Sequence, residues 1–192
     1  MTKGELIVVQ ILLLFLLWTC FYMTRYHIHV QAKVGTFVSV IVGANVGFLV
    51  GMGSYLFLGQ PPSMATLLGS CIGLGIGWFV AIPVSTFAII LGSFSGVISG
   101  VIGVWVIQVV SVEQAHGVWL FFSFLTLFWF MVILFMILKR IPPHEDVFVK
   151  KFIQHPLILG LALIVIFSIY GKIERFLPQA EDTTTPAPPK TE

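Results

Sequence analysis

The chain has 192 residues, of which 58% are hydrophobic and only 9% are charged, and its mean hydropathy is +1.04. A soluble domain usually carries about 25% charged residues, so this composition excludes a water-soluble globular protein. The formal net charge of +2 is too small to indicate a nucleic-acid partner. We therefore predict that the surroundings of the chain are a lipid bilayer.

Apolar segments of 18 or more residues have the length that crosses a bilayer core of about 30 Å. The first carries bulky Trp18 where a signal peptide would need small residues for cleavage, so we expect a retained helix. The predicted fold class is all-α: one transmembrane bundle over residues 1–177 and a disordered, Pro- and Thr-rich tail at 178–192. The six helices are predicted at residues 5–23, 34–58, 64–89, 93–111, 118–138 and 156–171.

The third and fourth helices are separated by no polar loop. From Met64 to Val110 the chain would measure about 70 Å as one helix, more than twice the bilayer core, so it must turn back. We favour a break between residues 89 and 93, near Gly92, with only a kink at Pro83. A break at Pro83 itself is the alternative.

Basic residues concentrate in two connections, residues 24–33 and 139–155. Basic residues that flank membrane spans favour the cytoplasm. Four predicted helices separate these two loops, and an even number of crossings brings both to the same side. We therefore expect a multi-pass plasma-membrane protein with loops 24–33 and 139–155 in the cytoplasm and both termini outside.

Small residues recur at every fourth position in the three central helices, where residues 34–112 hold no Asp, Glu, Lys or Arg. Residues four apart share a helical face, and small residues let helix backbones approach closely in lipid. The pattern predicts a glycine-zipper core of helices two to four, whereas the aromatic segment 118–138 suits a lipid-facing rim. The predicted packing residues form three GxxxGxxxG runs: Gly43, Gly47, Gly51; Gly69, Gly73, Gly77; and Gly92, Gly96, Gly100.

The run Gly69–Gly77, the segment Ile82-Pro83-Val84-Ser85 and the run Gly92–Gly103 also resemble a known kind of protein. The chain is similar there to small glycine-rich polytopic membrane proteins of Gram-positive, spore-forming bacteria, which have no assigned activity. This resemblance implies a bacterial plasma membrane.

Two further sets of residues suggest functions other than packing. Asn45 is the best candidate for an inward polar group, and with Pro83 it would mark a solute pathway along helices two to four. No metal site is predicted outright. The nearest approach to one is a set of soft ligands at the inner face, suited to an ion such as Cu(I): Cys20, Met23, His27 and His29.

No nucleophile with a neighbouring base and no opposed pair of carboxylates is recognisable, so we predict no enzyme, no catalytic residue and no cofactor. The favoured function is an accessory, scaffold or assembly subunit that packs through its glycine faces, with a second copy or another membrane protein as partner. The first alternative is a small transporter or channel for a neutral solute or an ion. Soft-metal handling at the inner face is the second alternative.

Overall fold

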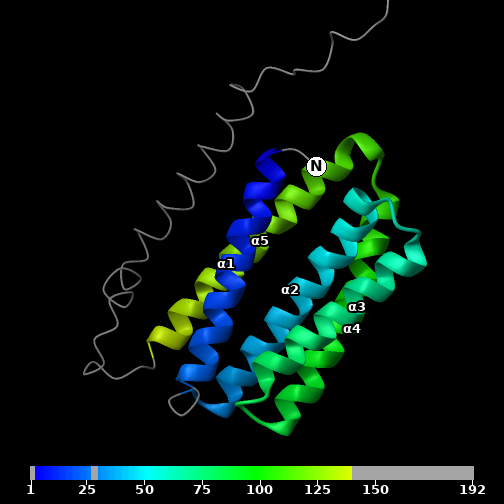
Figure 1. Ribbon diagram of the computed structural model, residues 1–192. Helices are drawn as coiled ribbons and strands as arrows, with labels where there is room; N and C mark the ends of the chain where they lie inside the picture. Colours follow the sequence, from blue (N-terminus) through cyan, green and yellow to red (C-terminus); the bar gives the residue numbers. More distant parts are fainter. Residues whose placement is uncertain (1–2, 27–29, 140–192) are drawn as a thin grey trace, which may run out of the picture. The chain divides into compact units, whose positions relative to one another are not determined.

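A computed structural model of the chain describes residues 3–26 and 30–139 (Figure 1). These residues belong to one compact unit and form helices without any strand. The predicted sixth helix (156–171), the rest of the inner loop beyond residue 139 and the tail (178–192) lie outside the described residues. The described helices are α1 (Lys3–Arg25), α2 (Ala32–Leu58), α3 (Pro62–Ala81), α4 (Thr86–Val109) and α5 (Val112–Leu138).

All five described helices are long and apolar enough to cross a membrane. Their large apolar side chains also face outward: Leu17, Phe87 and Trp105 are between 65% and 70% exposed. Side chains of this size would be costly to expose to water, but they match the hydrocarbon of a bilayer. The all-helical, multi-pass membrane character predicted from composition therefore agrees with the structure.

The break between α3 and α4 lies at Pro83, so the favoured boundary near Gly92 was wrong. Pro83 has no amide hydrogen to donate, and its ring clashes with a continuing helix. α3 ends at Ala81, and α4 begins after Ser85, whose side-chain oxygen accepts a hydrogen bond from the Ala88 amide at 3.1 Å. Gly92 lies inside α4 instead. The predicted helices 64–89 and 93–111 are thereby corrected to Pro62–Ala81 and Thr86–Val109.

α5 begins six residues earlier than the predicted residue 118. The carbonyl of Ser111 accepts hydrogen bonds from the amides of Gln114 and Ala115, both at 3.0 Å, and this closes the first turn at once. Glu113 and His116 therefore belong to α5 and not to the connection before it. In the connection between α2 and α3, Gly59 adopts a left-handed conformation (φ 59°) directly after α2. Glycine reaches this conformation without strain because it has no Cβ.

The helices form two groups (Figure 1). α2, α3 and α4 share the most extensive contacts, with α3 antiparallel to the other two. α1 and α5 contact each other, and their contacts with the trio are fewer: α5 mainly meets α2, and α1 meets α3. α1 and α5 run parallel, since Glu5 and His116, near their first turns, are in contact. The core therefore consists of a tight trio and a more loosely attached pair.

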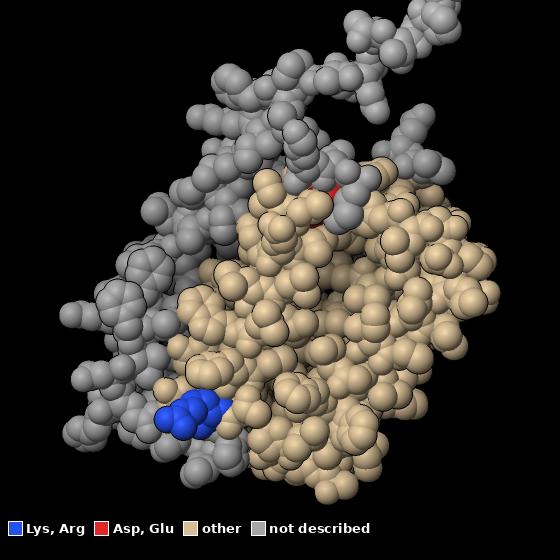
Figure 2. Space-filling view, viewed as in Figure 1, with Lys and Arg blue, Asp and Glu red and all other residues tan. Residues whose placement is uncertain are grey.

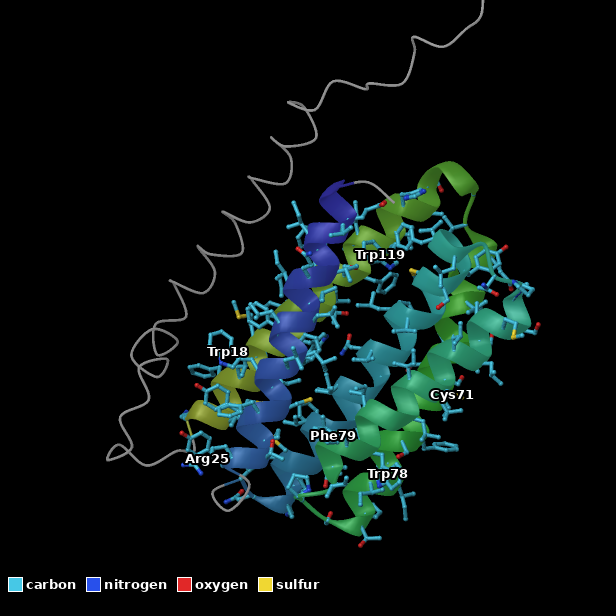
Figure 3. All side chains as sticks on the ribbon, viewed as in Figure 1. Trp18, Arg25, Cys71, Trp78, Phe79 and Trp119 are labelled. Atoms are coloured by element: carbon cyan, nitrogen blue, oxygen red, sulfur yellow. The ribbon has the colours of Figure 1, made fainter. Side chains whose placement is uncertain are left out.

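Charge is confined to the ends of the described helices. Arg25, Lys33 and Lys139 are exposed, and they lie where α1 and α5 end and α2 begins. Figure 2 shows a tan surface with a blue patch at that end, where Figure 3 places Arg25, and an acidic area at the other. Arg25 and Lys33, from the first basic connection, and Lys139, where the second begins, thus lie at the same end of the described helices.

Candidate functional site

The nine glycines of the three runs meet one another in the centre of the trio. An added Cβ at Gly43 would lie 2.5 Å from the carbonyl oxygen of Gly92 and 3.2 Å from the Cα of Gly77. Glycines of the three helices contact one another in the same way at each of the next two helical turns. The glycines therefore form three layers, each with one residue from α2, α3 and α4: Gly43, Gly77 and Gly92; Gly47, Gly73 and Gly96; Gly51, Gly69 and Gly100.

No residue larger than glycine fits in these layers without movement of a backbone. An added Cβ at Gly73 would lie 2.7 Å from both the Cα of Gly47 and the carbonyl oxygen of Gly96. Real Cβ atoms essentially never approach heavy atoms closer than 3.0 Å. The backbones of α2, α3 and α4 are thus in direct contact over two helical turns, about 12 Å of helix axis.

A fourth layer of small residues continues the series toward the Pro83 connection. Ser39, Ala81 and Ala88 come from the same three helices and are fully buried. The hydroxyl of Ser39 donates a 3.3 Å hydrogen bond to the carbonyl of Ala88, and that of Ser95 donates a 3.0 Å bond to the carbonyl of Val40. These hydroxyls link α2 with α4 where lipid offers no competing water.

The predicted pathway residues, Asn45 and Pro83, do not come together. Pro83 lies in the connection that packs near Gly35, and Asn45 lies ten residues further along α2, about 15 Å away along the helix axis. The Asn45 amide donates to the carbonyl of Ile41 at 2.9 Å, and its oxygen accepts a 3.0 Å bond from the hydroxyl of Thr126 on α5. Asn45 therefore joins α2 to α5 and does not face a space inside the trio.

The soft-ligand set is only partly described. Cys20 is half-buried and Met23 is buried, both on α1, while His27 and His29 lie outside the described residues. Among residues 3–26 and 30–139, no three His, Cys, Asp or Glu side chains gather closely enough to hold a metal ion. Cys71 is an exposed free thiol on α3 (Figure 3).

A second feature, which the sequence did not indicate, is an apolar cleft between α1, α2 and α5. It has a volume of about 310 Å³, and Figure 2 shows the surface hollowed between these helices. We name it the α1–α2–α5 cleft. Its walls are Val9, Leu12, Leu13 and Leu16 from α1; Val46, Leu49, Val50, Gly53, Ser54, Phe57 and Leu58 from α2; and Trp119, Thr126 and Phe130 from α5.

Polar and aromatic groups surround the end of this cleft where α1 and α5 begin. Oε1 of Glu5, which is 2% exposed, lies 2.6 Å from Nδ1 of His116. The ring of Phe57 makes edge contacts with His116 and with Trp119, at centroid distances of 5.8 and 4.9 Å. Trp119 is only 3% exposed, so α5 has a buried face and is not simply a lipid-facing rim.

The five described helices, each long and apolar enough to cross a membrane, are consistent with a multi-pass membrane protein. Comparison of the chain with family models, with curated proteins and with solved structures gives no match. The interpretation of function therefore depends on the geometry of the described residues.

Proposed function

We propose that the chain is a non-enzymatic accessory or scaffold subunit of the plasma membrane, built on a glycine zipper that makes α2–α4 one rigid unit. The observation that carries this proposal is the set of three glycine layers, in which the three backbones touch. Close backbone packing of small residues is a main source of helix association in lipid. A unit with such a core is suited to present a fixed outer surface to another membrane protein.

The glycine faces are occupied within the chain itself. Each glycine of the three runs meets the backbone of a neighbouring helix in the same molecule. A second copy cannot use these faces unless the trio opens. The partner surface of the proposed scaffold is therefore the lipid-facing outside of the unit, where Trp78, Phe94 and Trp105 are 52%, 63% and 70% exposed.

A solute pathway along α2–α4 has less support. Backbones in direct contact leave no room for a solute between the three helices. Asn45 is already bonded to Ile41 and Thr126, and the described parts of α2, α3 and α4 contain no buried charged side chain. Ionisable groups inside the membrane are the usual mark of ion and proton pathways.

The test combines affinity purification and transport measurements on the full-length protein. A scaffold should purify from native membranes with another membrane protein in fixed stoichiometry, and proteoliposomes of the pure protein should show no flux of small neutral solutes or ions. The double substitution Phe94→Ala/Trp105→Ala should release the partner while the protein remains folded. Gly75→Ala, which adds a methyl group in open space on α3, is the matched control that should retain it.

Two results would contradict the proposal. One is solute flux that depends on Asn45, for example flux abolished in Asn45→Leu without loss of folding. The other is a partner that stays bound when every exposed aromatic side chain of α3 and α4 has been replaced.

A further inference from the structure

Glu5 and His116 form a hydrogen-bonded acid–base pair near the starts of α1 and α5. Oε1 of Glu5 lies 2.6 Å from Nδ1 of His116, so one of these two atoms carries a proton. A distance this short is typical of a hydrogen bond between charged groups, here an imidazolium that donates and a carboxylate that accepts. The pair therefore joins the two helices by charge as well as by hydrogen bonding.

Water reaches the two partners very unequally. The side chain of Glu5 is 2% exposed, whereas that of His116 is 48% exposed. A buried carboxylate is costly unless a positive charge or hydrogen bonds compensate it. Histidine is the side chain whose charge ordinarily changes between pH 5 and 8. Protonation of the exposed imidazole therefore controls how well the buried charge of Glu5 is compensated.

The trio contributes no charged side chain beside this pair. α3, α4 and the adjoining end of α2 lie within residues 34–112, which contain no Asp, Glu, Lys or Arg. From α2, the ring of Phe57 makes an edge contact with the imidazole of His116, and Tyr55 adds only a phenol.

The other charged residues of this end belong to α1 and α5. Lys3 precedes Glu5 by two positions on α1, and Glu113 precedes His116 by about one turn on α5. Residues three apart are neighbours on a helix surface, whereas residues two apart are not. Glu113 is therefore the carboxylate whose effect on His116 a test must separate from that of Glu5.

The pair lies at one end of the α1–α2–α5 cleft. Phe57 and Trp119, which line the cleft, contact each other, and Phe57 also contacts His116. Val9, another lining residue, follows Glu5 by about one turn of α1. Separation of the start of α1 from α5 would therefore open this end of the cleft.

We propose that the Glu5–His116 pair is a pH-dependent latch: protonated His116 holds the start of α1 against α5, and loss of this proton releases α1 and opens the adjoining end of the cleft. The latch is strongest while the imidazole is protonated and the carboxylate is ionised, so it weakens as the pH rises through the titration of histidine. A neutral imidazole still donates a hydrogen bond, but without its positive charge the bond is weaker. This inference needs only the contact between α1 and α5, and it is independent of the scaffold proposal.

The experiment is hydrogen exchange, measured by mass spectrometry on the full-length protein in detergent, with variant and wild type compared at the same pH. At pH 5.5, the amides of residues 6–12 should exchange about fivefold to tenfold faster in His116→Gln than in the wild type, because glutamine keeps a donor but has no positive charge. At pH 8 the two proteins should exchange alike. The amides of residues 65–80 in α3 should not change and serve as an internal control.

A second variant tests the same charge in the opposite direction. His116→Lys keeps a positive charge at both pH values, so residues 6–12 should exchange about fivefold to tenfold more slowly than in the wild type at pH 8. This comparison decides the matter if His116→Gln fails to fold. Glu113→Gln, the matched control, removes the neighbouring carboxylate and should behave like the wild type at both pH values.

Four results would overturn the latch. The first is equal exchange of the wild type and His116→Gln at pH 5.5, and the second is a difference of the same size at pH 8. The third is a His116→Gln effect that persists in a Glu5→Gln background, because the charge would then act through another group. The fourth is loss of the effect in a Glu113→Gln background.

Discussion

Gly73 and Gly75 lie two positions apart on α3 and meet opposite surroundings. A methyl group at Gly73 would collide with the backbones of α2 and α4, while one at Gly75 would meet no atom within 4 Å. We expect Gly73→Ala to destabilise the protein by about 1–3 kcal/mol or more, because backbones must move apart to admit it. Gly75→Ala should be neutral or slightly stabilising, since alanine is the better helix former.

Helix content during titration with a denaturing detergent measures both variants. The difference between them isolates steric packing, since both add the same methyl group to the same helix. Equal stabilities for Gly73→Ala and Gly75→Ala would show that the trio does not pack as described.

The hydrogen bond between Thr126 and Asn45 is the polar link between α5 and α2. Thr126→Val keeps the shape of the side chain and removes the donor, so we expect a loss of about 0.5–1.5 kcal/mol in unfolding free energy. Thr36→Val is the control, because the Thr36 hydroxyl bonds only the carbonyl of Ala32 in its own helix. A double-mutant cycle with Asn45→Leu should give a coupling energy; strictly additive losses would mean that this bond does not form.

At the scale of elements, the break between α3 and α4 shows where the sequence becomes ambiguous. Pro83 and Gly92 both signal a helix end in soluble proteins, but glycine is common inside membrane helices. Tertiary contacts decide which of the two residues ends the helix. The carbonyl oxygen of Gly77 lies 2.9 Å from the position that a Cβ of Gly92 would take, so Gly92 is a packing residue inside α4. The four-residue spacing defines a helical face, but it does not reveal which residues of the other two helices meet that face.

Ser85 is the residue that starts α4. Because its side chain accepts from the Ala88 amide, Ser85→Ala should cost about 1 kcal/mol, the usual value of an N-cap. Ser85→Asp keeps a capping oxygen and should retain most of that stability. The unfolding midpoint measures both variants, and a Ser85→Ala protein as stable as the wild type would show that the Pro83 turn alone holds the start of α4.

At the scale of the whole molecule, the sequence could predict what the length and periodicity of its apolar segments reveal. The apolar lengths were sufficient to predict an all-helical membrane protein. They did not indicate the α1–α2–α5 cleft, because its walls come from three helices whose leucines and aromatics look like ordinary lipid-facing residues. The unpaired nitrogen of Trp119 is likewise a property of the packed structure, since indole N–H groups on membrane helices usually reach an interface.

The two basic connections provide a test of the arrangement as a whole. α1 and α5 end at the same end of the bundle, so Lys33 and Lys139 should share one side of the membrane, and Ser63, at the start of α3, should lie on the other. We expect single-cysteine variants Lys33→Cys, Lys139→Cys and Ser63→Cys, made in a Cys20→Ala/Cys71→Ala background, to separate in this way. In intact cells, a membrane-impermeant maleimide should label only Ser63→Cys if basic flanks face the cytoplasm.

Permeabilised cells should expose all three cysteines and so control for reactivity. Labelling of the two lysine positions from opposite sides would contradict the parallel arrangement of α1 and α5. Labelling of both from outside, with Ser63→Cys protected, would leave the fold intact but reverse its orientation. The basic residues of the two connections would then not determine the orientation of this chain.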